Sequence, residues 1–99
     1  MKKHIILWTL RDELTPPERE AAKQGIKSSL EALNGRVAGV QVLVRTDALP
    51  GSTADVMLET TGEEAALAVY ASHPEHKRAA VEKIRPFVKD KLAFDFEVE

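Results

Sequence analysis

Four short stretches of the chain, residues 3–10, 39–46, 53–60 and 91–99, have the patterns of strands, and hydrophobic and polar residues alternate along the last three. A period of two is typical of β-strands, because successive side chains point to opposite faces of a sheet. The first stretch is apolar at both parities, which is typical of a central strand covered on both faces. The pattern therefore predicts a sheet of four strands.

Between the first two strands, apolar residues recur at steps of three and four, which predicts an amphipathic helix. Thr15 is a suitable N-cap, Pro16 suits the first helical position, and Glu18 completes a capping box. The pattern continues to about residue 33, and Gly35 is suited to ending the helix.

A second helical region lies between the third and fourth strands, and a proline interrupts it. Residues 61–64 repeat the Thr-x-x-Glu spacing and predict the start of this region. Pro74 cannot continue a helix but can begin the next one, with Ser72 or His73 as its cap. Pro86 predicts the end of the second piece.

The predicted order β-α-β-β-α-α-β indicates a ferredoxin-like α+β sandwich with an antiparallel sheet of strand order 4-1-3-2. The helices can cover only one face of such a sheet. An exposed apolar face is typical of an interface, so we expect a homodimer through the sheet face. The residues left on that face are either Ile5 and Leu7 or Ile6 and Trp8, with either Val56 and Leu58 or Met57.

Composition narrows the classes of protein that fit. A length of 99 residues indicates one domain, residues 1–99, with a modest core. The absence of cysteine excludes disulfides, thiolate nucleophiles and cysteine-based zinc sites. The net charge of −2, without a block of like charges, argues against a nucleic-acid surface. The apolar run from Ile5 to Trp8 is too short for a signal peptide or a membrane span, so we expect a cytoplasmic protein without membrane contact.

The candidate chemistry gathers at the proline break, where the stretch 70–76 holds the only tyrosine and two of the three histidines. We expect this break to face His4 on the first strand and to form the polar end of a small apolar pocket. The near-neutral pKa of a histidine suits acid–base work, and a phenol such as Tyr70 can hold an oxyanion. The alternatives are a solvated His4 and a Tyr70 that only packs in the core, while His76 is the better candidate to point inward.

Two further residues have competing interpretations. His73 and His76 are three apart, a spacing that can bind a metal, but no third ligand is indicated, so we predict no metal site and a capping role for His73. No phosphate loop or dinucleotide motif is present, and we predict no cofactor. Asp55 starts the third strand and could orient His4 or raise its pKa, or it could simply be solvated.

Several segments together resemble the stress-responsive α/β-barrel (Dabb) domain over nearly the whole chain. They are Lys3 to Trp8, Asp55 to Leu58, Phe94 to Phe96 and, most specifically, the Tyr-x-x-His-Pro-x-His element of residues 70–76. The resemblance implies a ferredoxin-like monomer and a dimer whose two sheets form an α/β barrel.

The resemblance also implies roles for individual residues. The family includes a plant polyketide cyclase that performs an intramolecular aldol condensation, and its catalytic positions fall on His4, Tyr70 and His76. A further pocket histidine falls on Asp55, a departure that changes the charge of the pocket. The resemblance turns His4, Ile6, Trp8 and Met57 toward the helices and leaves Ile5, Leu7, Val56 and Leu58 for the barrel. The expected pocket residues are Ile6, Trp8, Ile26, Asp55, Met57 and His73.

Three functions fit the sequence. The first is a dimeric protein that binds a small apolar or carbonyl-containing ligand and has no assigned reaction. The second is a proton-transfer enzyme, such as a cyclase of the aldol type or an isomerase or lyase, with His76 as general base and with His4 and Tyr70 holding an enolate oxygen. The third is a structural or interaction module without a ligand site.

Overall fold

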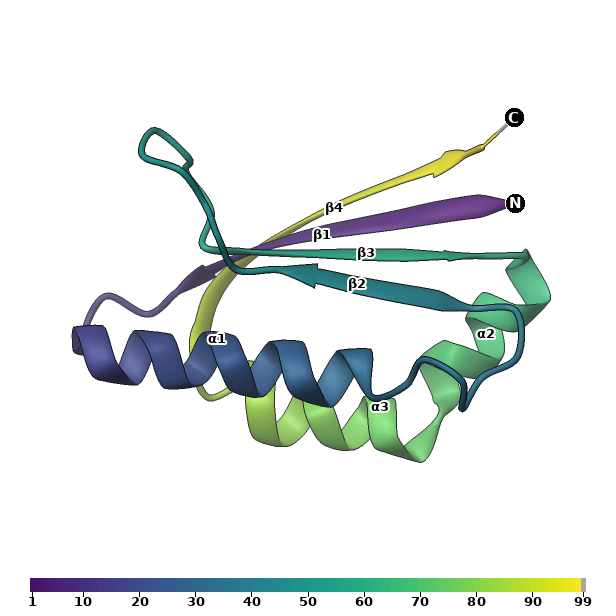
Figure 1. Cartoon of the computed structure of the whole chain (residues 1–99), viewed down its shortest axis with the longest axis horizontal. Helices are drawn as coiled ribbons and strands as arrows, with labels where there is room; N and C mark the ends of the chain where they lie inside the picture. The colour runs from purple at the N-terminus through teal and green to yellow at the C-terminus, as the bar shows by residue number, and fades with distance from the viewer. Residues whose placement is uncertain (99) are drawn as a thin grey trace.

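The computed structural model describes residues 1–98 and consists of one sheet with helices on one of its faces (Figure 1). The strand order is β2-β3-β1-β4, and all neighbouring strands are antiparallel. This confirms the predicted ferredoxin-like fold and its strand order. The elements are β1 (Lys2–Leu10), α1 (Pro16–Glu31), β2 (Gln41–Arg45), β3 (Val56–Gly62), α2 (Glu64–Ser72), α3 (Pro74–Ala79), the π-helical turn η1 (Ala80–Ile84) and β4 (Val88–Glu97).

Helix α1 begins with the predicted capping box. The Thr15 hydroxyl accepts a hydrogen bond from the Glu18 amide at 3.3 Å, and the Glu18 carboxylate accepts one from the Thr15 amide at 2.8 Å. The helix buries Ala22, Ile26 and Leu30 against the sheet. The apolar spacing and the capping box therefore both predicted the helix that the structure contains.

The predicted start of the second helical region is wrong. Thr61 and Gly62 belong to β3, and α2 begins after Glu63, which makes no side-chain cap hydrogen bond. Thr61 pairs with Lys3 on one side and Gln41 on the other, so sheet pairing outweighs the local capping signal.

The second piece of the helical region continues past α3 as the π-helical turn η1 and ends before Pro86. The last strand begins at Val88, three residues earlier than the predicted Lys91. Val88 pairs with Leu10 next to a register shift in β1, and the Arg11 amide donates to the Phe87 carbonyl at 2.9 Å. The alternating pattern did not mark these residues because Val88 is followed by three charged residues, at positions 89–91.

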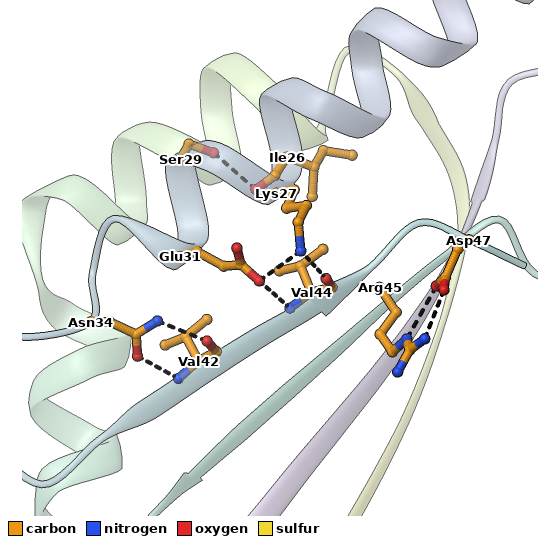
Figure 2. Close-up of polar contacts among 9 residues, drawn as sticks. All are labelled: Ile26, Lys27, Ser29, Glu31, Asn34, Val42, Val44, Arg45 and Asp47. Atoms are coloured by element: carbon orange, nitrogen blue, oxygen red, sulfur yellow. Dashed lines mark hydrogen bonds and ion pairs between the residues drawn. The ribbon is translucent and has the colours of Figure 1, made fainter.

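Side chains of α1 cover the outer edge of β2 (Figure 2). The Asn34 side chain, just beyond α1, donates to the Val42 carbonyl and accepts from the Val42 amide, both at 2.8 Å. Glu31 accepts from the Val44 amide at 3.0 Å, and Lys27 donates to the Val44 carbonyl at 2.7 Å. These contacts satisfy the backbone groups of an edge strand and leave it unavailable for further pairing.

The strand register corrects one expectation about the two faces of the sheet. Leu58 pairs with Ile6 and Val56 pairs with Trp8, and all four side chains are buried beneath the helices. Met57 pairs with Leu7 and lies on the opposite face. The expectation that Met57 faces the helices and that Val56 and Leu58 face away is wrong, because directly paired residues share a face.

The face away from the helices is apolar and uncovered. It carries Ile5 and Leu7, as expected, beside three large side chains of β4. These are Leu92, Phe94 and Phe96, which are 70%, 68% and 42% exposed. We call the surface formed by Ile5, Leu7, Leu92, Phe94 and Phe96 the open face. No helix among residues 1–98 is long and apolar enough to span a membrane.

Candidate functional site

A cavity of about 460 Å³ lies between the covered face of the sheet and helices α2 and α3. Its apolar wall comes from both layers, and its polar residues come from β1, β3, α2 and α3. The apolar lining residues are Ile6, Leu58, Leu67, Ala68 and Ala71, and the polar ones with buried or half-buried side chains are His4, Thr60, Tyr70 and His76. Three charged residues, Lys2, Glu64 and Lys91, complete the lining.

The proline break places His76 against Tyr70. Residue 73 is extended between the two helices, and its Nδ1 accepts a hydrogen bond from the Glu75 amide at 3.1 Å, so His73 caps α3. Pro74 then occupies the first turn, where its missing N–H leaves no bond unmade. The His76 ring meets the Tyr70 ring edge-on, with ring centroids 4.6 Å apart and an interplanar angle of 61°.

Three buried polar atoms belong to residues that line this cavity, and none of the three has a hydrogen-bond partner among residues 1–98. They are the hydroxyl oxygens of Thr60 and Tyr70 and Nδ1 of His76. Unpaired buried polar atoms are rare in folded proteins, and each costs about 1–3 kcal/mol. Their concentration in one cavity is therefore a signal of function.

Burial shifts the pKa values of two of these residues in opposite directions. It raises the pKa of the Tyr70 phenol, and the nearby Thr60 hydroxyl offsets part of that rise without reaching hydrogen-bonding geometry. Burial lowers the pKa of His76, the Ala71 carbonyl acts against this, and the charges of His4 and His73 lower it further. At neutral pH the site therefore holds a protonated phenol and a neutral imidazole.

His4 is held from the side of β4. Its Nδ1 contacts the carboxylate of Asp95, the residue paired with it across the two strands. A carboxylate at Nδ1 favours the tautomer with its proton there and leaves Nε2 as an acceptor. The sequence pattern does not indicate this contact, which depends on the register of β4 against β1.

Four of the expected site residues meet in the cavity, together with residues that the sequence analysis did not place there, Thr60 among them. His4, Ile6, Tyr70 and His76 all line it. Thr60, which pairs with His4 across β1 and β3, was not singled out in the sequence. Its place follows once Leu58 is known to face inward, since residues two apart on a strand share a face.

The other expected residues lie elsewhere. Trp8 and Ile26 are buried in the core and do not line the cavity. Asp55 and Met57 line a different hollow of about 390 Å³ beside the connection between β2 and β3. His73 serves as a cap and is absent from the lining of the site cavity.

Asp55 is not beside His4, and the reason is the direction of its strand. Because β3 is antiparallel to β1, the start of β3 lies beside the end of β1. The Asp55 carboxylate accepts from the Leu10 amide at 2.8 Å and from the Arg19 guanidinium at 2.9 Å. The expectation that it orients His4 is therefore wrong.

Within residues 1–98, no group of three or more histidine or acidic side chains has the geometry to hold a metal ion.

Comparison with known proteins agrees with this architecture. Residues 3–98 match the family described as the stress responsive A/B barrel domain, or Dabb. The chain belongs to the Dabb family. Comparison of this Dabb chain with curated proteins finds no significant match.

Several solved structures share the fold. A dimeric protein of unknown function from Bacteroides fragilis is 27% identical, with a TM-score of 0.87, and the match covers 98% of this chain and 95% of that one. A Dabb protein from Mesorhizobium loti is 17% identical, with a TM-score of 0.72 and coverage of 99% and 96%. A hydroxynitrile lyase from Passiflora edulis is 16% identical, with a TM-score of 0.74 and coverage of 99% and 93%.

Proposed function

We propose that this Dabb protein is a homodimer that binds a small molecule in the cavity between its sheet and helices α2 and α3. The observation that carries the proposal is the set of unpaired polar atoms on Thr60, Tyr70 and His76 around one cavity. A bound molecule with a carbonyl or hydroxyl group would pair with these atoms and recover the free energy that burying them costs.

The size and lining of the cavity suit a small organic ligand. Small-molecule sites are mostly apolar clefts of about 300–1,000 Å³ with a few placed polar groups. The volume of about 460 Å³ falls in that range. Ile6, Leu58 and Leu67 supply apolar walls, so we expect the ligand to have an apolar body and a polar group that faces Tyr70.

The open face supports the dimer. Leu92 and Phe94 are each about two thirds exposed at 70% and 68%, and such a concentration of large apolar side chains is typical of a protein interface. The related protein from Bacteroides fragilis is described as dimeric. Pairing of two open faces would bury these side chains and complete a barrel.

A ligand screen by thermal shift tests the binding function. A ligand at 100 times its dissociation constant adds about 2.7 kcal/mol to the free energy of unfolding. We expect compounds with an apolar body and a carbonyl or hydroxyl to stabilise the wild type and to lose this effect in His76→Ala. Equal stabilisation of both proteins would place the ligand elsewhere, and the absence of any stabilising compound would favour a structural module.

A second candidate function is proton transfer on a carbonyl compound. His76 has the character of a general base because burial lowers its pKa and keeps it neutral at pH 7. His4 and Tyr70 line the same cavity and would donate to a developing enolate oxygen, His4 in its protonated form. The same fold occurs in the hydroxynitrile lyase from Passiflora edulis, so it is compatible with an enzyme.

Exchange of ketone α-protons with D₂O, followed by NMR, separates this candidate from binding alone. With cyclohexanone as the probe, we expect exchange above the buffer rate that disappears in His76→Ala. A rate equal to buffer, measured with a ketone shown to bind by thermal shift, would leave binding as the function and exclude this proton transfer for that ketone.

A further inference from the structure

The cavity lining contains a lysine without an ion-pair partner. Lys91 projects from β4 on the same face as Trp8, with which it pairs, and contributes to the lining. It makes no salt bridge or side-chain hydrogen bond within residues 1–98.

The remaining charges around the cavity leave Lys91 uncompensated. Lys2 also lines the cavity, but its ammonium lies 3.4 Å from the Glu64 carboxylate, so these two charges offset each other. His76 is neutral at neutral pH because burial lowers its pKa. Among the lining residues, the Lys2–Glu64 pair therefore sums to zero, and Lys91 adds one positive charge.

The position of Lys91 also matters. It lies four residues from Asp95, which pairs with His4, and four residues of a strand span about 13 Å. Apolar lining residues, Ile6 and Leu58 among them, lie on the same face of the sheet as Lys91 and His4. A ligand that reaches both places must have a charged end, an apolar middle and a polar group several bonds away.

We infer that the cavity selects singly charged organic anions, such as a carboxylic acid with an apolar body, and that Lys91 binds the anionic head group. This inference rests on the proposed binding function and adds the chemical class of the ligand. A dianionic head group fits less well, because Lys91 is the one uncompensated positive charge among the lining residues. A cationic head group would be repelled by Lys91.

The test compares three probes with the same eight-carbon chain. Octanoate, 1-octanol and octylammonium are titrated into wild-type protein, and dissociation constants are measured by calorimetry. An exposed ion pair contributes up to about 1 kcal/mol, so we expect octanoate to bind about fivefold more tightly than 1-octanol and octylammonium to bind most weakly. The advantage of octanoate should shrink as salt is raised, because screening weakens an exposed pair.

Substitutions test whether Lys91 supplies the positive charge that favours octanoate. We expect Lys91→Gln to remove the preference for octanoate and Lys91→Arg to retain it. Lys77 is exposed on α3 and does not line the cavity, so Lys77→Gln is the matched loss of one positive charge and should leave the preference unchanged.

Each failure has a distinct meaning. Equal affinity for octanoate and 1-octanol, or an unchanged preference in Lys91→Gln, would overturn the role of Lys91 while leaving the cavity as a binding site. If none of the three probes binds at millimolar concentration, the anion selectivity is contradicted, and the binding function is contradicted as well when the thermal-shift screen also finds no stabilising compound.

Discussion

At the scale of single residues, the site is a group of side chains whose polar atoms are buried without partners within residues 1–98. Tyr70 is only 4% exposed, yet its hydroxyl makes no hydrogen bond there. A side chain kept only for packing could be phenylalanine. A buried phenol with an unpaired hydroxyl supports the proposed ligand site over a purely structural core.

Replacing Tyr70 with phenylalanine should therefore stabilise the free protein. Removal of an unpaired buried hydroxyl without a change in ring packing should raise the free energy of unfolding by about 1 kcal/mol. Urea denaturation measures this change. A loss of 1 kcal/mol or more would show that the hydroxyl already has a structural partner and that Tyr70 belongs to the core alone.

The lowered pKa of His76 predicts a pH dependence of stability. Between the lowered folded-state pKa and the ordinary value of 6.5, the unfolded chain binds more protons than the folded one. The free energy of unfolding should therefore fall as the pH is lowered through this window and should be insensitive to His76 well above it.

The comparison between wild type and His76→Gln isolates this effect, since other titrating groups contribute to both. Urea denaturation at pH 7.5 and pH 5 should show a larger loss of stability in the wild type. Parallel losses in the two proteins would mean that His76 is not buried in the neutral form.

At the scale of elements, local signals predicted most boundaries and failed where the sheet intervenes. The capping box at Thr15 was correct because nothing else competes for that segment. The same spacing at Thr61 misled, since Thr61 is paired on both sides as part of β3. The break at Pro74 was predictable because proline has no N–H to donate and clashes with the preceding helical turn, and this effect does not depend on the rest of the fold.

The end of β3 gives a prediction at this scale. A Cβ added at Gly62 would lie 2.9 Å from the Gly39 carbonyl oxygen and 3.3 Å from Leu67, so the backbone would have to move. We expect Gly62→Ala to lower the free energy of unfolding by about 1–3 kcal/mol, measured by urea denaturation.

Gly25 provides the matched control in the same protein. It lies inside α1, and a Cβ there would meet only the Lys83 side chain at 3.7 Å. Gly25→Ala should raise stability by about 0.5–1 kcal/mol, because alanine favours a helix interior. Equal effects of the two substitutions would contradict the close packing at the end of β3.

At the scale of the whole molecule, the order of strands followed from the sequence but the register did not. Strand β1 carries apolar side chains on both of its faces, so its pattern does not show which face the helices cover. Met57 was expected on the helix-covered face and lies on the opposite one. Asp55 lies far from His4 because β3 runs antiparallel to β1, which puts the start of β3 beside the end of β1. The contact of Asp95 with His4 and the position of Thr60 depend on the strand register. A shift of one residue in the pairing would turn these side chains to the other face of the sheet.

The open face predicts how two molecules assemble. Phe94 lies in its centre, beside Ile5, so Phe94→Glu should introduce charges into the interface and yield a monomer. Sedimentation at micromolar concentration should find a dimer for the wild type. Val81→Glu, at an apolar residue that is 52% exposed on η1, is the control and should remain dimeric. A monomeric wild type would contradict the proposed assembly.

The central claim is that the cavity around Thr60, Tyr70 and His76 is a ligand site. Calorimetric titration of the strongest ligand from the thermal-shift screen tests it most directly, with wild type, Tyr70→Phe and Ser52→Ala. Ser52 lines the separate hollow near the β2–β3 connection and serves as the control. Loss of one hydrogen bond worth about 1 kcal/mol predicts about fivefold weaker binding to Tyr70→Phe and unchanged binding to Ser52→Ala. Unchanged binding to Tyr70→Phe together with weakened binding to Ser52→Ala would place the ligand in the other hollow and contradict the account.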